Sequence, residues 1–132
     1  MRKTSYPQRI RFTGPRQVDL EAFEPTEPGP GEVRVRVLYS LLSTGTEATV
    51  FARAFDAGTH WDSWVKYPFY PGYALIGEIE SLGDAVQDRH MGQLVAIRHG
   101  HCSEATVPAD QTHPLPEGID PTQAAWFALG KI

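Results

Sequence analysis

A short turn rich in hydroxyl groups is the stretch of this sequence best placed for chemistry. It runs from Ser43 to Glu47, reads S-T-G-T-E and follows a strand-like segment. A hydroxyl beside a glycine turn can relay a proton or hold a carbonyl oxygen, and a nearby carboxylate can orient a ligand hydroxyl or pair with a cation. Local sequence alone favours a simpler interpretation, an ST-turn with a solvated Glu47, because no partner base is evident.

Two histidines and the single cysteine form a second candidate site, in the run H-G-H-C that contains His99, His101 and Cys102. Ligands at i and i+2 on one strand face make a plausible half-site for a metal. A tetrahedral zinc needs further ligands, and the other three histidines are scattered without ligand spacing. The pattern therefore favours a polar strand entry with a small buried thiol over a metal site.

Phosphate-binding patterns are missing from the sequence. Gly72 and Gly77 have the G-x-x-x-x-G spacing, but Glu78-Ile79 replaces the Lys-[Ser/Thr] that a P-loop needs. We therefore expect any nucleotide to bind elsewhere. Residues 56–70 are rich in aromatic side chains without a sustained period, which indicates a long ordered loop that either lines an apolar pocket or, as we favour, caps the core.

Short alternating segments joined by Gly and Pro turns predict the elements that must position these residues. The expected strands cover residues 8–12, 18–23, 32–40, 73–82, 93–98 and 102–107. The central one follows a turn at Pro71-Gly72 and contains Gly77, which indicates a bend or a close backbone approach. A short helix is expected over residues 48–55. The pattern is typical of a small β-barrel or sandwich.

The last residues have the signature of a helix start. Asp120 is a fitting N-cap, Pro121 stands at the favoured first position and Gln123 completes a capping box. The apolar pattern that follows is interrupted at Ile132 in mid-helix. We therefore expect that the natural protein continues, or that this chain is an excised domain.

Composition bounds the class of protein. The chain has 132 residues, 41% hydrophobic and 21% charged, which predicts one soluble domain. A net charge of -4 argues against a nucleic-acid partner, and the basic residues near the start are interpreted as a solvated strand face. No apolar run is long enough to span a membrane. One cysteine and no signal-like start make a reducing, cytoplasmic location the expectation.

Four motifs, taken in order, resemble the N-terminal GroES-like catalytic domain of the medium-chain dehydrogenase/reductase superfamily. Residues 28–37 resemble the family's PGPGEVLVRV entry strand, and Thr44 to Glu47 resemble its C-G-T-D turn. Residues 71–79 are similar to P-G-H-E-x-x-G-x-V, and residues 103–118 to AEYVVVPAD followed by LPEG. The resemblance implies a mainly β, partly open barrel with short helices over residues 1–120. Residues 121–132 would begin a C-terminal helix linking to a missing Rossmann domain.

The departures from the family pattern concern zinc. Thr44 stands where zinc-dependent members have cysteine, and Tyr73-Ala74 stand where they have His-Glu. A hydroxyl is a poor zinc ligand beside a thiolate or an imidazole. The four-cysteine structural lobe is also missing. The resemblance therefore implies a zinc-independent branch with no metal ligands, and the S-T-G-T-E and P-G-Y segments are similar to the bacteriochlorophyllide dehydrogenase-like members.

The resemblance also implies roles for individual residues. Hydride transfer between a nicotinamide, NAD or NADP, and an alcohol or carbonyl substrate would occur in the cleft between this domain and the Rossmann domain. Thr46 matches the proton-relay hydroxyl beside the substrate oxygen. Thr44, Gly45 and Glu47 match the nicotinamide side of the cleft. Tyr73, in the lost ligand position, would donate a hydrogen bond to a carbonyl and so replace part of the metal's polarising role.

Two interpretations stay open at this point. The first is the substrate-facing domain of an NAD(P)-dependent oxidoreductase that acts on a small-molecule substrate. This domain would be inactive alone, because its partner is its own Rossmann domain, and the full-length protein has a homodimer as an option. The second is a non-catalytic GroES-like binding or assembly module, which loss of the zinc ligands favours. Retention of Thr46 and the interrupted terminal helix favour the first.

Overall fold

The computed structural model describes residues 6–130, with side chains through Trp126. The elements in chain order are β1 (Gln8–Gly14), β2 (Gln17–Ala22), β3 (Glu32–Ser40), α1 (Thr46–Ala52), α2 (His60–Trp64), β4 (Leu75–Leu82), β5 (Leu94–Ile97), β6 (Glu104–Pro108), a 3-10 turn η1 (Ala109–Gln111), β7 (Thr112–Pro114) and α3 (Pro121–Gly130). Within this part of the chain, no helix has the length and apolar character needed to cross a bilayer.

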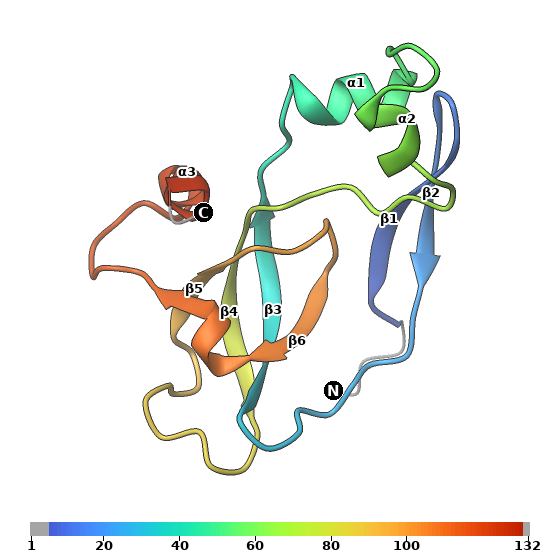
Figure 1. Cartoon of the computed structure of the whole chain (residues 1–132). Coiled ribbons are helices and arrows are strands. Elements are labelled where there is room, and N and C mark those ends of the chain that lie inside the picture. Colours follow the sequence, from blue (N-terminus) through green and yellow to red (C-terminus); the bar gives the residue numbers. More distant parts are fainter. Residues whose placement is uncertain (1–5, 131–132) are drawn as a thin grey trace.

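Two antiparallel sheets build the domain. Five strands pair in the order β6-β3-β4-β5-β7, and β1 and β2 form a separate hairpin. Figure 1 shows the hairpin standing beside the larger sheet, with α1 and α2 over one end and α3 on the side of β4 and β5. This arrangement confirms the predicted mainly β, partly open barrel.

Strand β3 has one buried and one charged face, as its period of two predicts. Val33 and Val35 are fully buried in the main core cluster. On the other face, the Arg34 guanidinium donates to Glu80 at 3.0 Å and the Arg36 guanidinium to Glu78 at 3.2 Å. The alternation of valine and arginine thus gives β3 its orientation in the sheet.

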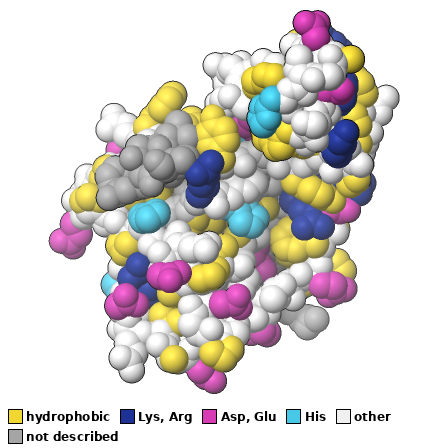
Figure 2. Space-filling view, in the orientation of Figure 1, with side chains coloured by type: hydrophobic (Ala, Val, Ile, Leu, Met, Phe, Trp, Pro, Cys, Tyr) yellow, Lys and Arg dark blue, Asp and Glu magenta, His cyan; other side chains and the backbone are white. Residues whose placement is uncertain are grey.

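The hairpin is tied to the rest of the domain by its backbone. Phe12 and Phe69 exchange N–H···O bonds of 2.8 and 2.9 Å, and the Ile10 N–H donates to the His101 carbonyl at 3.1 Å. The basic side chains Arg9 and Arg11 pair with carboxylates of β2. This confirms the strand-face interpretation for those two arginines. Figure 2 shows acidic and basic side chains scattered among hydrophobic ones over one face of the molecule.

The aromatic stretch before β4 differs from the predicted loop because it contains the short helix α2. Trp61, Tyr67 and Phe69 pack against a cluster whose buried members are Phe12, Val50 and Val65. We call this set the aromatic cluster. It lies between the hairpin and the two small helices, as the capping interpretation predicts. Strand β7 was also not predicted, since three residues are too few to show a period.

Helix α3 begins as expected. The Asp120 carboxylate accepts the Thr122 N–H at 3.0 Å, which satisfies a free donor of the first turn. Ala124 and Ala125 are buried against Ile76 and Ala96 of the sheet. Trp126, by contrast, is 65% exposed.

Candidate active site

The S-T-G-T-E turn leads into α1 and directs one carboxylate inward. Gly45 is the N-cap, and a Cβ built on it would meet no atom within 4 Å. Thr49 Oγ1 donates to the Gly45 carbonyl at 2.9 Å, which ties the turn to the helix. Glu47 Oε2 accepts the Ser43 N–H at 2.6 Å. The carboxylate therefore folds back over the turn and leaves its other oxygen free for a second partner.

That second partner is an imidazole. Glu47 Oε1 and His101 Nε2 are in hydrogen-bond contact, and the other ring nitrogen, Nδ1, contacts the hydroxyl of Ser40. Glu47 is 8% exposed and His101 is 3% exposed. The solvated Glu47 that local sequence favoured is therefore wrong, because a buried ring nitrogen supplies the partner that the carboxylate needs.

The backbone around His101 fixes the position of the ring. Its N–H donates to the Pro71 carbonyl at 2.8 Å, and its carbonyl accepts the Ile10 N–H. Gly72 has φ +113°, and a Cβ there would lie 2.4 Å from the His101 nitrogen and 2.8 Å from its Cγ. Only glycine combines that backbone conformation with so close an approach. The Pro71-Gly72 turn thus makes room for the imidazole.

An apolar pocket opens above the Glu47–His101 pair. Its volume is about 350 Å³. Its walls are Ile10, Phe12, Val18, Leu42, Ala48, Phe51 and Pro71, and its polar groups are Ser43, Thr44, Glu47 and His101. A pocket with mostly apolar walls and a few convergent polar groups suits a small organic ligand, whose polar atom would be directed by those groups.

Residues 29–118 match the family model described as the alcohol dehydrogenase GroES-like domain. The chain belongs to this family. The match confirms the resemblance drawn from the four motifs and places the GroES-like domain in a superfamily of oxidoreductases, the medium-chain dehydrogenases/reductases.

Curated relatives show the same relationship. A quinone oxidoreductase of Pseudomonas aeruginosa is 32% identical over 92% of this chain and 37% of its own length. A 2-desacetyl-2-hydroxyethyl bacteriochlorophyllide A dehydrogenase of Cereibacter sphaeroides is 33% identical over 53% of this chain and 21% of its own length. The GroES-like domain described here thus spans well under half the length of these relatives.

The fold is also that of a solved oxidoreductase. The crystal structure of a short chain alcohol dehydrogenase from E. coli CFT073, complexed with NADH, superposes with a TM-score of 0.72. The alignment has 21% identity and covers 92% of this chain and 42% of that one. At this identity the likeness concerns the fold of the GroES-like domain alone.

The residues at the zinc-ligand positions of the family do not fit a zinc ion. Thr44 offers a hydroxyl, Tyr73 a phenol and Ala74 no donor at all, and the Ala74 side chain is fully buried. Zinc prefers thiolate, imidazole and carboxylate ligands. Over residues 6–126, no group of three His, Cys, Asp or Glu side chains is placed to hold a metal.

The structure brings some of the expected site residues together and separates others. Thr44 and Glu47 line the apolar pocket, and Gly45 is exposed between them. Thr46 is half-buried at the first position of α1. Tyr73 packs instead against the alanine-rich cluster beside α3. The roles of these residues toward substrate and cofactor stay predictions.

Ser40 is a functional candidate that sequence reasoning missed, and His101 was considered only as half of a metal site, not as the partner of Glu47. His99 and His101 do not share a face, because His99 is exposed with Nδ1 2.9 Å from the Gly100 carbonyl, whereas His101 is buried. His101 and Glu47 lie 54 residues apart, so no local pattern relates them. The available signal was indirect: a histidine in an alternating strand entry needs a polar partner if it faces the core.

Proposed function

We propose that this chain is the substrate-facing domain of a zinc-independent, NAD(P)-dependent oxidoreductase that interconverts an alcohol and a carbonyl compound. The observation that carries the proposal is the position of the hydroxyl-rich turn. Thr44 and Glu47 stand at the polar end of a pocket whose other walls are apolar. That arrangement holds a carbon skeleton away from water and presents its oxygen to hydrogen-bonding groups.

The exposed turn at Thr44 and Gly45 fits the nicotinamide side of the site, because Gly45 leaves open space next to the pocket. When bound, the nicotinamide supplies or accepts the hydride. The remaining tasks belong to this chain. Thr46 relays the proton of the substrate oxygen, the Glu47–His101 pair keeps the polar end of the pocket in one geometry, and Tyr73 donates a hydrogen bond to a carbonyl oxygen.

Most cofactor contacts are assigned to a following Rossmann domain, and α3 to the helix that leads into it; residues 131–132, which were expected to continue that helix, lie outside the described residues. Relatives and solved structures support this division, since they are much longer than this chain. A homodimer of the longer protein would then form through that second domain. The 132-residue chain alone is expected to show no turnover.

A non-catalytic binding or assembly module is the second candidate. The observation in its favour is the donor set at Thr44, Tyr73 and Ala74, which has lost the family's zinc ligands. This module would keep the barrel and the apolar pocket but bind no nicotinamide.

Calorimetric titration with NADH and NADPH separates the two candidates, using a chain extended past Ile132 into whatever the gene encodes next. We expect micromolar binding of one of them and no stoichiometric zinc in the same sample. With an alcohol that the extended protein oxidises, Thr46→Ala should lower kcat by about 10²-fold, as loss of a proton-transfer group does. Absence of nicotinamide binding would favour the assembly module, and unchanged turnover in Tyr73→Phe would remove the role given to Tyr73.

A further inference from the structure

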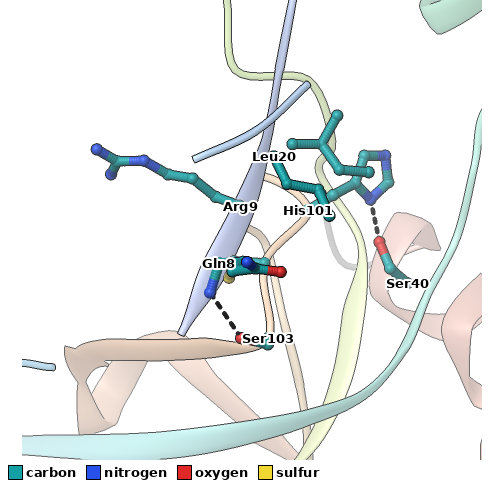
Figure 3. Close-up of a pocket in the computed structure, with 8 residues that line it drawn as sticks. Gln8, Arg9, Leu20, Ser40, His101 and Ser103 are labelled. Atoms are coloured by element: carbon teal, nitrogen blue, oxygen red, sulfur yellow. Dashed lines mark hydrogen bonds between the residues drawn. The ribbon is translucent and has the colours of Figure 1, made fainter. Parts of the chain in front are cut away.

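His101 lies between two pockets, of which the apolar pocket is only one. The second, which we call the lateral pocket, has a volume of about 250 Å³ and shares Ile10 and His101 with the first. Its lining residues are Gln8, Arg9, Ile10, Leu20, Ser40, His101, Cys102 and Ser103. Figure 3 shows the imidazole directed toward the Ser40 hydroxyl on this side.

Ser40, His101 and Glu47 form a continuous chain of three hydrogen-bonding groups. The Ser40 hydroxyl contacts Nδ1, and Nε2 contacts a Glu47 carboxylate oxygen. The other oxygen of Glu47 is held by the Ser43 N–H at 2.6 Å. When the carboxylate is ionised, Nε2 carries the ring proton and donates it, which leaves Nδ1 as the acceptor for the hydroxyl. The same three roles of nucleophile, base and orienting acid occur in serine hydrolases, with the two ring nitrogens exchanged.

The solvent exposure of the three groups differs in the way that nucleophilic catalysis by serine requires. The base and the orienting acid are 3% and 8% exposed, so their interaction is protected from water. Ser40 is exposed at the end of β3 and lines the lateral pocket, which places it beside a reactant bound there. We propose that Ser40 is an activated nucleophile and that the lateral pocket accepts small activated acyl esters.

The proposed reaction is ester hydrolysis through an acyl-serine. Ser40 Oγ bonds to the ester carbonyl carbon while its proton passes to Nδ1, and Glu47 stabilises the imidazolium through Nε2–H. The C–O bond to the leaving alcohol then breaks, and that alcohol takes the proton from Nδ1. Water attacks the acyl-serine in the same way, which releases the acid and restores the Ser40 hydroxyl. The reaction uses only ester and water.

Two features define the substrate class. The volume of about 250 Å³ admits a short acyl chain or a single aromatic ring. Ile10 and Leu20 give the pocket an apolar side, so uncharged esters fit better than charged ones. Serine here faces Nδ1 and the carboxylate faces Nε2, the reverse of the usual serine hydrolase ring orientation, and either imidazole nitrogen is able to act as the base. Neither nicotinamide nor a second domain takes part, so this activity is independent of the proposed oxidoreductase function.

A fluorophosphonate probe tests the proposal on the 132-residue chain itself, with the adduct located by peptide mass spectrometry. We expect the adduct on Ser40 and not on Ser103. Ser103 is the internal control, because it is an exposed serine of the same pocket whose Oγ accepts the Gln8 N–H at 3.0 Å and has no imidazole contact. Urea-unfolded chain should show no preference for Ser40.

Variants then separate activation from simple exposure. His101→Ala should slow labelling of Ser40 by about 10²-fold, as expected for loss of a general base, and Glu47→Gln should also slow it. Ser63→Ala, at an exposed serine that lines neither of the two pockets, should leave it unchanged, and circular dichroism checks that each variant is folded. Hydrolysis of p-nitrophenyl acetate should fall in parallel and be lost in Ser40→Ala. Absence of a Ser40 adduct in the folded wild-type chain, or equal labelling of Ser40 and Ser103, would overturn the proposal without any variant.

Discussion

Cys102 follows His101 directly, yet its thiol lies in surroundings that suppress ionisation. Burial raises the pKa of Cys102 to about 11, against the smaller opposing effects of a hydrogen bond with the Glu104 backbone and of the nearby Arg9 guanidinium. The sulfur lies 3.5 Å from His99 Nδ1. Since the thiolate is the reactive form, the folded protein holds its only cysteine in an unreactive state.

Alkylation by iodoacetamide measures this effect. At pH 8 we expect the native chain to react about 10²-fold more slowly than the urea-unfolded chain, whose thiol has an ordinary pKa. The native rate should rise with pH toward an inflection near pH 11. The raised pKa favours the folded state at all pH values below the unfolded pKa, and that contribution is lost as pH rises toward about 11. Equal native and unfolded rates at pH 8 would contradict the burial of the thiol.

At the residue scale, the sequence could predict one half of the site but not the other. The turn from Thr44 to Glu47 is contiguous, so residue types and spacing identify it. The imidazole partner of Glu47 comes from a distant segment, since His101 follows β5, and Ser40, which contacts the other nitrogen of that ring, ends β3. Gly72 shows the same limit. The turn at Gly72 was predicted, but the sequence does not show that the His101 imidazole packs against it, because the two segments meet only in the folded chain.

At the scale of elements, the pairing of β3 with β4 depends on a close approach at Gly77. Gly77 pairs with Val37, and the register shifts on either side of this point. A Cβ on Gly77 would lie 2.3 Å from Val35 Cγ1 and 2.6 Å from the Arg36 carbonyl oxygen. One of these atoms belongs to the backbone, so a rotamer change alone cannot relieve the contact. The predicted close approach at Gly77 is confirmed.

Gly77→Ala should therefore destabilise the domain by about 1–3 kcal/mol, the usual cost of overpacking a core. Gly14→Ala in β1 is the matched control, because its Cβ would approach only the flexible end of the Gln17 side chain, with Oε1 at 2.9 Å and Cδ at 3.4 Å. Urea unfolding followed by circular dichroism gives both values. The expectation fails if the Gly77→Ala midpoint is no lower than that of Gly14→Ala.

Element types were predicted best where one period lasts for many residues. β3 has the predicted bounds, since valine and arginine alternate through its first half, where Val33 and Val35 are buried and Arg36 is exposed. Helix α2 was missed because its five residues include no buried position, so no apolar periodicity marks them. For helix α1, the predicted start lay two residues late, because Gly45 caps it without a side-chain hydrogen bond that the sequence would reveal.

At the scale of the whole molecule, the domain has cores of unequal size. The main cluster joins the central strands, where β3 is hydrogen-bonded to both β4 and β6, and β4 also to β5. Among the described residues, the aromatic cluster under α1 and α2 has three buried members, Phe12, Val50 and Val65. It is connected to the hairpin by ring contacts such as that between Phe12 and Phe51, whose centroids are 5.3 Å apart. The candidate site lies between these two parts.

Native-state hydrogen exchange should therefore reveal two levels of protection. We expect the slowest amides in β3 and β4, which open only with global unfolding, and faster exchange in α1 and α2, which open locally around the aromatic cluster. Phe12→Leu should accelerate exchange in α1 and α2 while leaving the amides of β3 and β4 nearly unchanged, because Phe12 belongs to the aromatic cluster and not to the main one.

The amide of His101 is informative, since it donates a hydrogen bond to the Pro71 carbonyl at the boundary between the two parts. If the His101 amide exchanges as fast as the amides of α1 and α2, the Glu47–His101 contact opens without unfolding of the sheet. One uniform protection level throughout the domain would contradict the division into two parts.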